Sequence, residues 1–359
     1  MMDAYVLDRS YNQLAVIDVY ASFIWTERFR EIGDFELYLP FSAISYSALK
    51  KDNYIYIKDS ETYMVIETVE VNASSSEGPM TTVTGRCLKS ILDRRIVWDM
   101  TVLNGNLQDA VEKILNENVI NPSDTRRKIP NVKFTRSTDP RITAMQTDTV
   151  WHGEMISDVI RLLCAYHSIG WKAIPYGEGG IEIQLFAGQD RSYEQEDNFW
   201  VVFSKGYENL LSSHYYESTR DTKTVCRIAD SSSMDGSILS ATAYDQNGGG
   251  SGLDRRESFI ESYAPTTDED TGEELTDAQR AEYLISQGQK ELSEAGDNVY
   301  VEGEIDAQRQ YLYGRDFFMG DIVQVDTDFG IGMQCRVMEV IRSQDDSKGY
   351  KITPTFETV

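Results

Sequence analysis

Residues 32–41 read IGDFELYLPF, and the alternation in this stretch decides the fold class. Its apolar and polar residues alternate strictly, with Phe35, Leu37 and Leu39 on one side and Asp34, Glu36 and Tyr38 on the other. Because successive side chains leave a strand on opposite faces, the pattern predicts a strand with one buried face and one polar face. Pro40 then ends the strand, since proline cannot donate a hydrogen bond to a neighbouring strand. We expect the polar face to serve a purpose other than filling a core.

The overall composition is that of a globular protein rich in strands. The chain has 359 residues, of which 41% are hydrophobic and 26% charged, and it contains 21 Tyr, 13 Phe and only 8 Pro. Aromatic residues are enriched in strands. No apolar run reaches the roughly 18 residues that span a bilayer, so no stable membrane insertion is expected. The N-terminus MMDAYVLDRSYNQ lacks the basic start and apolar stretch of a signal peptide, which predicts synthesis and folding in a cytoplasm.

The charge is strongly acidic and unevenly distributed. The chain carries 34 basic and 59 acidic residues, a net charge of −25. Such a protein repels phosphates, which argues against DNA reading and against binding to anionic membranes. Residues 257–306 hold fifteen acids, with only Arg280 and Lys290 as bases. This segment is either a solvated acidic loop and helix face or a surface that keeps a negatively charged molecule from adhering.

The order of the predicted elements divides the chain into three domains. Residues 1–100 contain closely spaced strands, which favours antiparallel pairing and a barrel or a sandwich as the first domain. Residues 101–200 contain two helical patterns and a hairpin, and they predict a small inserted α/β domain. Residues 201–359 return to strands and predict a second strand-rich domain. It includes one helix at about 276–295, with a capping box of Thr276 and Gln279, and a flexible GGGSG-containing loop at 246–256.

No motif in the sequence carries catalytic or metal chemistry. The three histidines, His152, His167 and His214, have no partners at metal-binding intervals, and the four cysteines are far apart and are expected to be buried free thiols. Two acidic segments, 268–274 and 326–330, lack the spacing of a calcium loop, and a loop before a helix and a hairpin turn are expected there. We predict no catalytic, cofactor-binding or metal-binding residues, no cofactor, and a protein that is not an enzyme.

Four stretches resemble one known family. They are WTERFREIGDFELYLPF (25–41), TGRCLKSILDRRIVWD (84–99), FSKGYENLLSSHYYESTRDTKTVCRIAD (203–230), and the 276–295 helix followed by FFMGDIVQVD (317–326). In this order they resemble the tail-tip (baseplate) hub proteins, or tail-associated structural proteins, of long-tailed phages and prophages, which are similar to the hub of contractile-tailed phages. Six positions are expected to define the fold rather than a site: Trp25, Arg28, Phe35, Gly85, Leu92 and Trp98.

The resemblance implies a β-rich α+β fold in which two tube-like β-barrel domains flank a small α/β insertion. It implies a homotrimeric ring at the virion tail tip that closes or continues the tail tube channel, through which DNA passes without specific binding. The implied partners are the distal tail protein, the tail tube and tape measure proteins, and tail fibre or spike proteins. Longer relatives add a lytic or receptor-binding extension, and we expect none here because the chain ends at TPTFETV.

Two other functions stay open. A tail-associated cell-wall hydrolase, a glycosidase or a peptidase, could use an acid pair that the sequence does not locate. A host carbohydrate-binding module could use some of the 21 Tyr and 5 Trp to stack on sugars.

Overall fold

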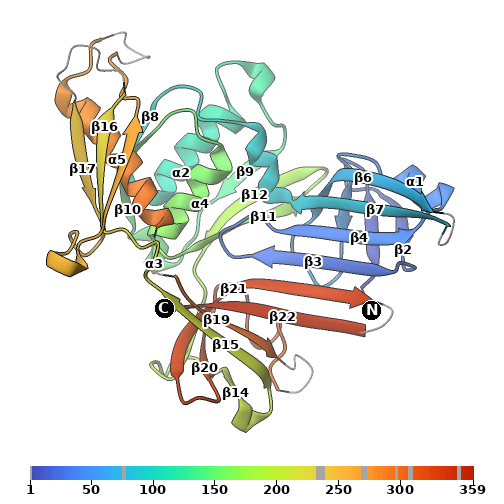
Figure 1. The fold of residues 1–359 in the computed structure, drawn as a ribbon. Coiled ribbons are helices and arrows are strands. Elements are labelled where there is room, and N and C mark those ends of the chain that lie inside the picture. The colour runs from blue at the N-terminus through green and yellow to red at the C-terminus, as the bar shows by residue number, and fades with distance from the viewer. Residues whose placement is uncertain are drawn as a thin grey trace.

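The computed structural model describes residues 2–74, 78–231, 239–267, 273–295, 298–305, 310–345 and 349–359. The chain is β-rich, with one large sheet and a few helices, most of which pack on smaller sheets beside it (Figure 1). Its buried apolar residues form four clusters, one for each of the units described below. The predicted β-rich α+β class is therefore confirmed.

The first unit is a strand block built from the N-terminal residues. Its strands follow the sheet order β3-β4-β7-β6-β5-β1-β2, and a short helix α1 joins β4 to β5. The bounds are β1 Ala4–Leu7, β2 Gln13–Ile17, β3 Ser22–Arg28, β4 Asp34–Pro40, α1 Ala43–Ala48, β5 Tyr54–Tyr56, β6 Met64–Ser74 and β7 Gly78–Cys87. All pairings are antiparallel, as the short spacing predicted. Phe23, Trp25 and Phe35 lie in its core.

The second unit is a strand block from the C-terminal part of the chain, with the sheet order β15-β19-β22-β21. Strand β20 pairs with the outer part of β21 and carries the short strands β13 and β14 on its other edge. The bounds are β13 Asp190–Arg191, β14 Val202–Ser204, β15 Leu210–Ser218, β19 Asn298–Ile305, β20 Ile322–Asp326, β21 Gly332–Asp345 and β22 Gly349–Thr358. Its core contains Phe203, Phe317 and Phe356.

The two strand blocks are joined by a backbone ladder. Strand β21 pairs antiparallel with β3 from Glu339↔Arg28 to Asp345↔Ser22. A single sheet therefore runs from β15 through the joint to β2, and Figure 1 shows β3 and β21 side by side. Among the described residues this sheet begins at β15 and ends at β2, and these two end strands do not pair with each other. The two closed tube-like barrels are therefore not confirmed.

The third unit is the α/β insertion, which lies beside the first strand block (Figure 1). It contains the two-stranded sheet β8–β10 and the three-stranded sheet β11-β12-β9, with helices α2 and α4 packed against them. The bounds are η1 Leu88–Arg94, β8 Thr101–Asn106, α2 Leu107–Leu115, η2 Asn116–Ile120, η3 Thr125–Arg127, β9 Val132–Thr135, α3 Pro140–Thr143, β10 Gln146–Trp151, α4 Ile156–Tyr166, β11 Gly170–Tyr176 and β12 Gly180–Phe186. Asn106 caps α2 by accepting a hydrogen bond from the Gln108 backbone N–H.

The fourth unit is an insertion within the second strand block that the sequence did not indicate. Between β15 and β19 the chain forms a separate three-stranded sheet, order β17-β16-β18, covered by helix α5. The bounds are β16 Val225–Asp230, β17 Ser240–Tyr244, η5 Gly252–Asp254, β18 Glu257–Ser262 and α5 Asp277–Glu294. The short helix η4, Lys205–Tyr207, belongs to the second strand block and lies between β14 and β15. The capping box of Thr276 and Gln279 is present at the start of α5.

The predicted flexible loop 246–256 connects β17 to β18 in this fourth unit. The Asp245 carboxylate accepts hydrogen bonds from the backbone N–H groups of Asn247 and Gly249, and Thr224 Oγ1 donates to Gly249 O. These contacts fix the first half of the loop to the unit, and its flexibility stays a prediction. The acidic segment 257–306 contributes β18 and α5 of this fourth unit and also β19, which is a strand of the large sheet. Helix α5 lies far from β3 and β4 in Figure 1.

Candidate functional site

The alternation in residues 34–40 produces the predicted division of faces in β4. Phe35, Leu37 and Leu39 are buried at 2% exposure or less, whereas Glu36 is exposed and Asp34 and Tyr38 are half-buried. The buried side chains pack into the core of the first strand block. The prediction from the sequence is confirmed, and the polar side of β4 faces away from that core.

This polar face continues over both strand blocks. Residues directly opposite each other in an antiparallel pair lie on the same face of the sheet. One such row crosses six strands through Lys351, Ser343, Ile24, Glu36, Thr84 and Thr68. A parallel row contains Asp345, Ser22, Tyr38, Thr82 and Glu70. We call this surface the polar sheet face; it is one surface because β3 and β21 are paired.

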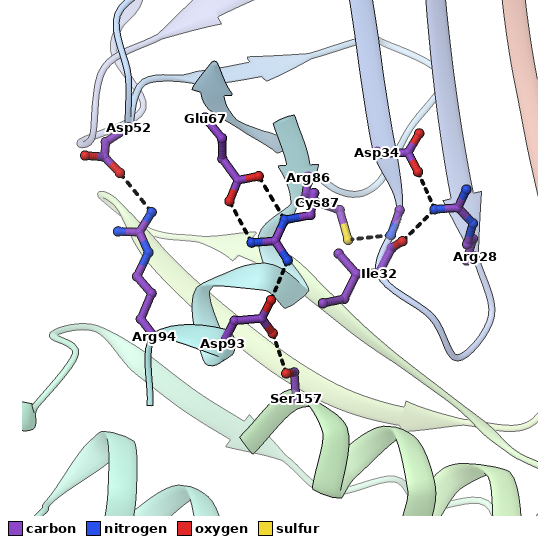
Figure 2. Close-up of polar contacts among 11 residues, drawn as sticks. Arg28, Ile32, Asp34, Asp52, Glu67, Arg86, Cys87, Asp93, Arg94 and Ser157 are labelled. Atoms are coloured by element: carbon purple, nitrogen blue, oxygen red, sulfur yellow. Dashed lines mark hydrogen bonds and ion pairs between the residues drawn. The ribbon is translucent and has the colours of Figure 1, made fainter. Parts of the chain in front are cut away.

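An arginine at the joint holds three segments together on the polar sheet face. Arg28 of β3 donates to the Asp34 carboxylate of β4, to Ile32 O at 2.7 Å, and from Nε to Glu339 Oε2 of β21 at 2.5 Å. Figure 2 shows Arg28 reaching both Asp34 and Ile32. Burial lowers the pKa of Arg28, but the hydrogen bonds to the two carboxylates outweigh it, so the pKa is raised overall. The guanidinium is charged and bridges the two blocks.

On the buried side of the same joint lies a second charged group. Arg342 of β21 is 2% exposed, its Nη1 lies 3.0 Å from Glu27 Oε1, and its Nη2 donates to Asp59 O at 2.9 Å. Trp25 Nε1 donates to the same Glu27 oxygen at 3.0 Å, and the Arg342 guanidinium lies 5.1 Å from the ring centre of Tyr313. Burial beside Glu27 raises the pKa of Tyr313. We call Glu27, Arg342, Trp25 and Tyr313 the joint cluster.

A buried lysine fixes the turn between β3 and β4. The ammonium of Lys89 lies within 3.5 Å of four consecutive backbone carbonyls, those of residues 28–31. It also lies 4.9 Å from the ring centre of Trp171 in β11, whose Nε1 donates to Arg30 O. Burial lowers the pKa of Lys89 to about 8. One side chain thereby ties the turn of the first block to the α/β insertion.

A network of charged residues also attaches the α/β insertion to the first strand block (Figure 2). Arg86 of β7 donates to both oxygens of Glu67 in β6, at 2.8 and 2.9 Å, and to Asp93 of η1. The other Asp93 oxygen accepts a hydrogen bond from Ser157 in the first turn of α4. Because bidentate arginine–carboxylate pairs have a fixed geometry, this network sets the position of α4 relative to the sheet.

The positions expected to define the fold differ in their roles. Trp25, Phe35 and Leu92 are buried, and a Cβ at Gly85 would lie only 1.8 Å from Val65 O, so no larger residue fits there. Trp98 is 57% exposed and stacks under Arg127 instead of filling a core. The sequence therefore located the core positions but not the exposure of Trp98.

The remaining sequence candidates do not assemble into a site. His152 follows β10 and His167 ends α4, both in the α/β insertion, whereas His214 lies on β15 of the second strand block. Burial lowers the pKa of His167. All four cysteines are buried and free, as predicted. The segment 326–330 forms the turn between β20 and β21, as expected, whereas most of the segment 268–274 lies outside the described residues. The described residues contain no group of three or more His, Cys, Asp or Glu suited to a metal ion.

A cavity of about 600 Å³ lies between the two strand blocks and the β11–β12 hairpin. Glu27, Lys89 and Arg342 line it together with Asp321 and Arg191, which form a buried ion pair at 2.8 Å. Each of these charged side chains is engaged by an opposite charge or by backbone carbonyls. The chemistry of the joint is therefore that of a rigid connection between units.

A family model described as Siphovirus ReqiPepy6 Gp37-like protein matches residues 3–356. The chain belongs to this family. The resemblance to tail proteins of long-tailed phages that the sequence indicated is confirmed. No curated protein matches the chain in sequence.

Three solved structures of phage or prophage tail proteins are similar in fold to this chain. The 43 kDa tail protein of prophage MuSo2 from Shewanella oneidensis is 13% identical with a TM-score of 0.57, covering 99% of this chain and 98% of its own. A tail protein from Neisseria meningitidis MC58 is 12% identical with a TM-score of 0.54, over 99% and 96%. Prophage tail protein gp18 from Listeria monocytogenes EGD-e is 13% identical with a TM-score of 0.53, over 99% and 95%. At these identities the likeness concerns the fold.

The family and these neighbours support a structural component of a phage tail. In the described part of the chain, no helix combines the length and apolarity that crossing a membrane requires.

Proposed function

We propose that the chain is the structural hub of a phage tail tip. In this role three copies form a ring that closes or continues the channel of the tail tube and connects the distal tail protein to fibres or a spike. The observation that carries the proposal is the continuous sheet: one antiparallel ladder spans both strand blocks, and the polar sheet face continues across the joint from β22 to β6.

The two ends of this ladder suit ring closure. From β15 to β6 the sheet contains eight strands, and every neighbouring pair is antiparallel. Strand β5 pairs only with Met64 and Val65 of β6. Within the part of the chain that the structure describes, residues 68–73 of β6 therefore have a strand partner on one edge only, and the same is true of β15. Because eight is even, β15 of one copy would run antiparallel to β6 of the next. Open edges invite such pairing between chains.

Each strand block has its own core, and the proposed tube-like barrels are the two halves of the sheet curled over these cores. In a ring of three chains the six blocks would give pseudo-sixfold symmetry. The proposed channel wall is the polar sheet face, on which Glu36 and Glu70 carry negative charge. An acidic wall repels the phosphates of passing DNA, which therefore moves without adhering. The tail tube, tape measure and distal tail proteins are the proposed neighbours of the ring.

Cysteine cross-linking tests the ring directly. All four native cysteines are buried, so a variant with Val71→Cys on the free part of β6 and Leu211→Cys on β15 introduces the only accessible thiols within the described residues. Both positions are exposed, at 41% and 59%. Mild oxidation is expected to give dimers and then a closed trimer of about 122 kDa, three times the 40.8 kDa chain. A Val71→Cys variant paired with Tyr166→Cys, an exposed residue of α4 in the insertion, is the control.

Electron-microscope class averages of the purified chain provide an independent readout. Threefold rings with an open centre support the hub, whereas monomers that do not cross-link at any concentration contradict it. Incubation with host cell walls examines the enzymatic alternative. Release of sugars or peptides that is lost on mutating one acid would replace the structural proposal with a hydrolase.

A further inference from the structure

Four aromatic side chains gather at the end of the second strand block, away from its core. Tyr193, Trp200, Tyr207 and Phe329 are 43%, 50%, 52% and 54% exposed. They come from three connections: the loop between β13 and β14, the short helix η4, and the turn between β20 and β21. We call them the aromatic patch. Strands β14 and β20, which carry these connections, lie at the lower end of the molecule in Figure 1.

Specific contacts hold the three connections together. The rings of Tyr193 and Trp200 pack edge to face with 5.2 Å between their centres, and Tyr193 Oη donates to Asp326 Oδ2 at 3.4 Å. Lys205 Nζ, two residues before Tyr207, lies 2.9 Å from Asp328 Oδ2, which precedes Phe329. The patch is therefore one surface, with its members drawn from segments more than a hundred residues apart in the chain.

The loop that carries Tyr193 and Trp200 is internally braced. The Gln195 side-chain amide donates to the carbonyls of Ser192 and Asn198, both at 3.1 Å, and Trp200 Nε1 donates to Gln195 O at 3.0 Å. The buried ion pair of Arg191 and Asp321 anchors the start of the loop. These bonds present the rings to the outside in fixed positions, which reduces the entropy lost on binding. Exposed, preorganised Trp and Tyr are typical of protein-binding hot spots.

The charge around the aromatic patch indicates the kind of partner. Five exposed acids surround it: Glu194, Glu196, Asp197, Glu208 and Asp328. The two basic residues of the same segments are already paired, Lys205 with Asp328 and Arg191 with Asp321. A partner that offers Lys or Arg around an apolar centre is attracted to such a rim. A second copy of this chain docked patch to patch would place these acids against the same acids, which disfavours self-association through this surface.

We propose that the aromatic patch is the docking surface for a different protein of the same tail, one whose facing surface combines apolar side chains with lysine or arginine. The proposal rests on the proposed function in so far as the partner is a tail protein. The patch adjoins the start of β15 through η4, but it is formed by connections and not by the strand edges of β6 and β15, through which the ring would form.

Binding measurements with Trp200→Ala, Phe329→Ala and their double variant test the proposal. The probes are the recombinant distal tail protein and tail tube protein of the same virion, immobilised one at a time. Wild-type chain is expected to bind one probe, each single substitution to weaken binding at least tenfold, and the double variant to abolish it. The control is Leu253→Ala in η5, which removes an apolar side chain that is 97% exposed in the fourth unit. Circular dichroism melting confirms that each variant folds.

The charge of the partner is tested with Glu194→Gln, Glu196→Gln and Asp197→Asn combined, a variant that leaves the rings in place. It is expected to slow association severalfold at 50 mM salt, and wild-type affinity is expected to fall between 50 and 500 mM salt. An affinity that does not change with salt, or that is unaffected by this variant, overturns the basic partner.

Other results overturn the docking surface itself. These are no binding of wild type to either probe, binding unaffected by Trp200→Ala, self-association that Trp200→Ala abolishes, or a glycan-array signal lost in that variant. Light scattering of every variant separates this proposal from the ring. If a variant of the aromatic patch still has the mass of a trimer but no longer binds the probe, the patch serves docking and not ring formation. If the chain never forms trimers but binds the probe through Trp200, the proposed ring is wrong and the docking surface stands.

Discussion

Glu27 of β3 and Arg342 of β21 form a buried ion pair across the joint of the two strand blocks, with 3.0 Å between Oε1 and Nη1. Both lie on the core side of the sheet, opposite the polar sheet face on which Arg28 pairs with Glu339. Charged side chains thus hold the joint from both sides of the ladder. The joint fixes the angle between the blocks, and in a hub that angle would set the curvature of the ring.

Replacing Arg342 with Met is expected to reduce the free energy of unfolding by about 3–5 kcal/mol, because it leaves the largely buried Glu27 carboxylate without its cationic partner. The double variant of Glu27→Gln and Arg342→Met is expected to lose less than the single variant. Chemical denaturation measures both. The control is Arg126→Ala, whose side chain is 88% exposed beside Asp124 and is expected to cost less than about 0.5 kcal/mol. Equal losses for Arg342→Met and the double variant would contradict the explanation, because they would show that the Glu27 carboxylate carries no cost once its cationic partner is removed.

The lowered pKa of Lys89 predicts that the free energy of unfolding increases with pH. Burial lowers the pKa of this lysine in the folded protein to about 8, whereas a lysine in the unfolded chain has its ordinary pKa of 10.5. Between these two pH values the unfolded chain therefore binds more protons. Stability due to Lys89 therefore rises with pH through this window. Relative to a Lys89→Met variant, the wild type is expected to gain about 2 kcal/mol between pH 7 and pH 9.5.

Subtracting the variant removes the contributions of groups that Lys89 does not influence. Cys164 is not one of them, because burial raises its pKa to about 12 while Lys89 opposes that rise, so its contribution, which acts in the opposite direction above pH 9, does not cancel fully. Urea denaturation at six pH values gives the two curves. Parallel curves would mean that the four backbone carbonyls keep Lys89 protonated in the folded protein, against the effect of burial.

Local structure could be predicted from the sequence, whereas the pairing of strands that are distant in the chain could not. The alternation around Phe35, the Asn106 cap and the capping box at Thr276 are local patterns, and all three are confirmed. The pairing of β3 with β21 joins residues 311 positions apart, such as Arg28 and Glu339, and no local pattern encodes it. The strands of the fourth unit were recognised, but their separate sheet depends on the parallel pairing of β16 with β18.

The polar contacts of the candidate site were missed for the same reason. One signal was available: Lys89 stands in the apolar run GRCLKSIL, where a charged residue is unusual and a buried role could be suspected. Glu27 and Arg342 carried no such signal, since each looks like an ordinary polar residue of an alternating strand. The exposure of Trp98 was hidden because aromatic residues are buried more often than not.

Gly85 is expected to tolerate no side chain. An added Cβ would lie 1.8 Å from Val65 O and 2.9 Å from Val65 C, so β6 and β7 would have to separate where β6 bulges. Gly85→Ala should therefore lower the melting temperature by more than 10 °C or prevent folding, as strain in a packed sheet costs several kcal/mol. Gly206→Ala is the matched control, because the nearest atom to its Cβ would be Ser204 Oγ at 3.7 Å. A Gly85→Ala protein as stable as the control would contradict the close approach of the two strands.

Charge reversal on the polar sheet face tests the proposed channel wall. Glu36 and Glu70 share this face, and in a trimer each appears three times around the opening. Glu36→Lys with Glu70→Lys replaces six negative charges with six positive ones per ring. Basic residues bind phosphates by releasing counterions, so this variant is expected to retard double-stranded DNA in a gel at 50 mM salt and to release it by 300 mM.

The wild type should not retard DNA at either salt concentration. Glu178→Lys, at the exposed tip of the β11–β12 hairpin, combined with Glu257→Lys on β18, makes the same change in net charge away from the polar sheet face. If this control binds DNA as strongly as the Glu36 and Glu70 variant, net charge explains the binding and the polar sheet face is not a channel wall. The proposed channel wall is supported if only the Glu36 and Glu70 variant binds DNA, and if it does so only in chromatographic fractions that have the mass of a trimer. Such a result requires the six reversed charges to lie around one opening.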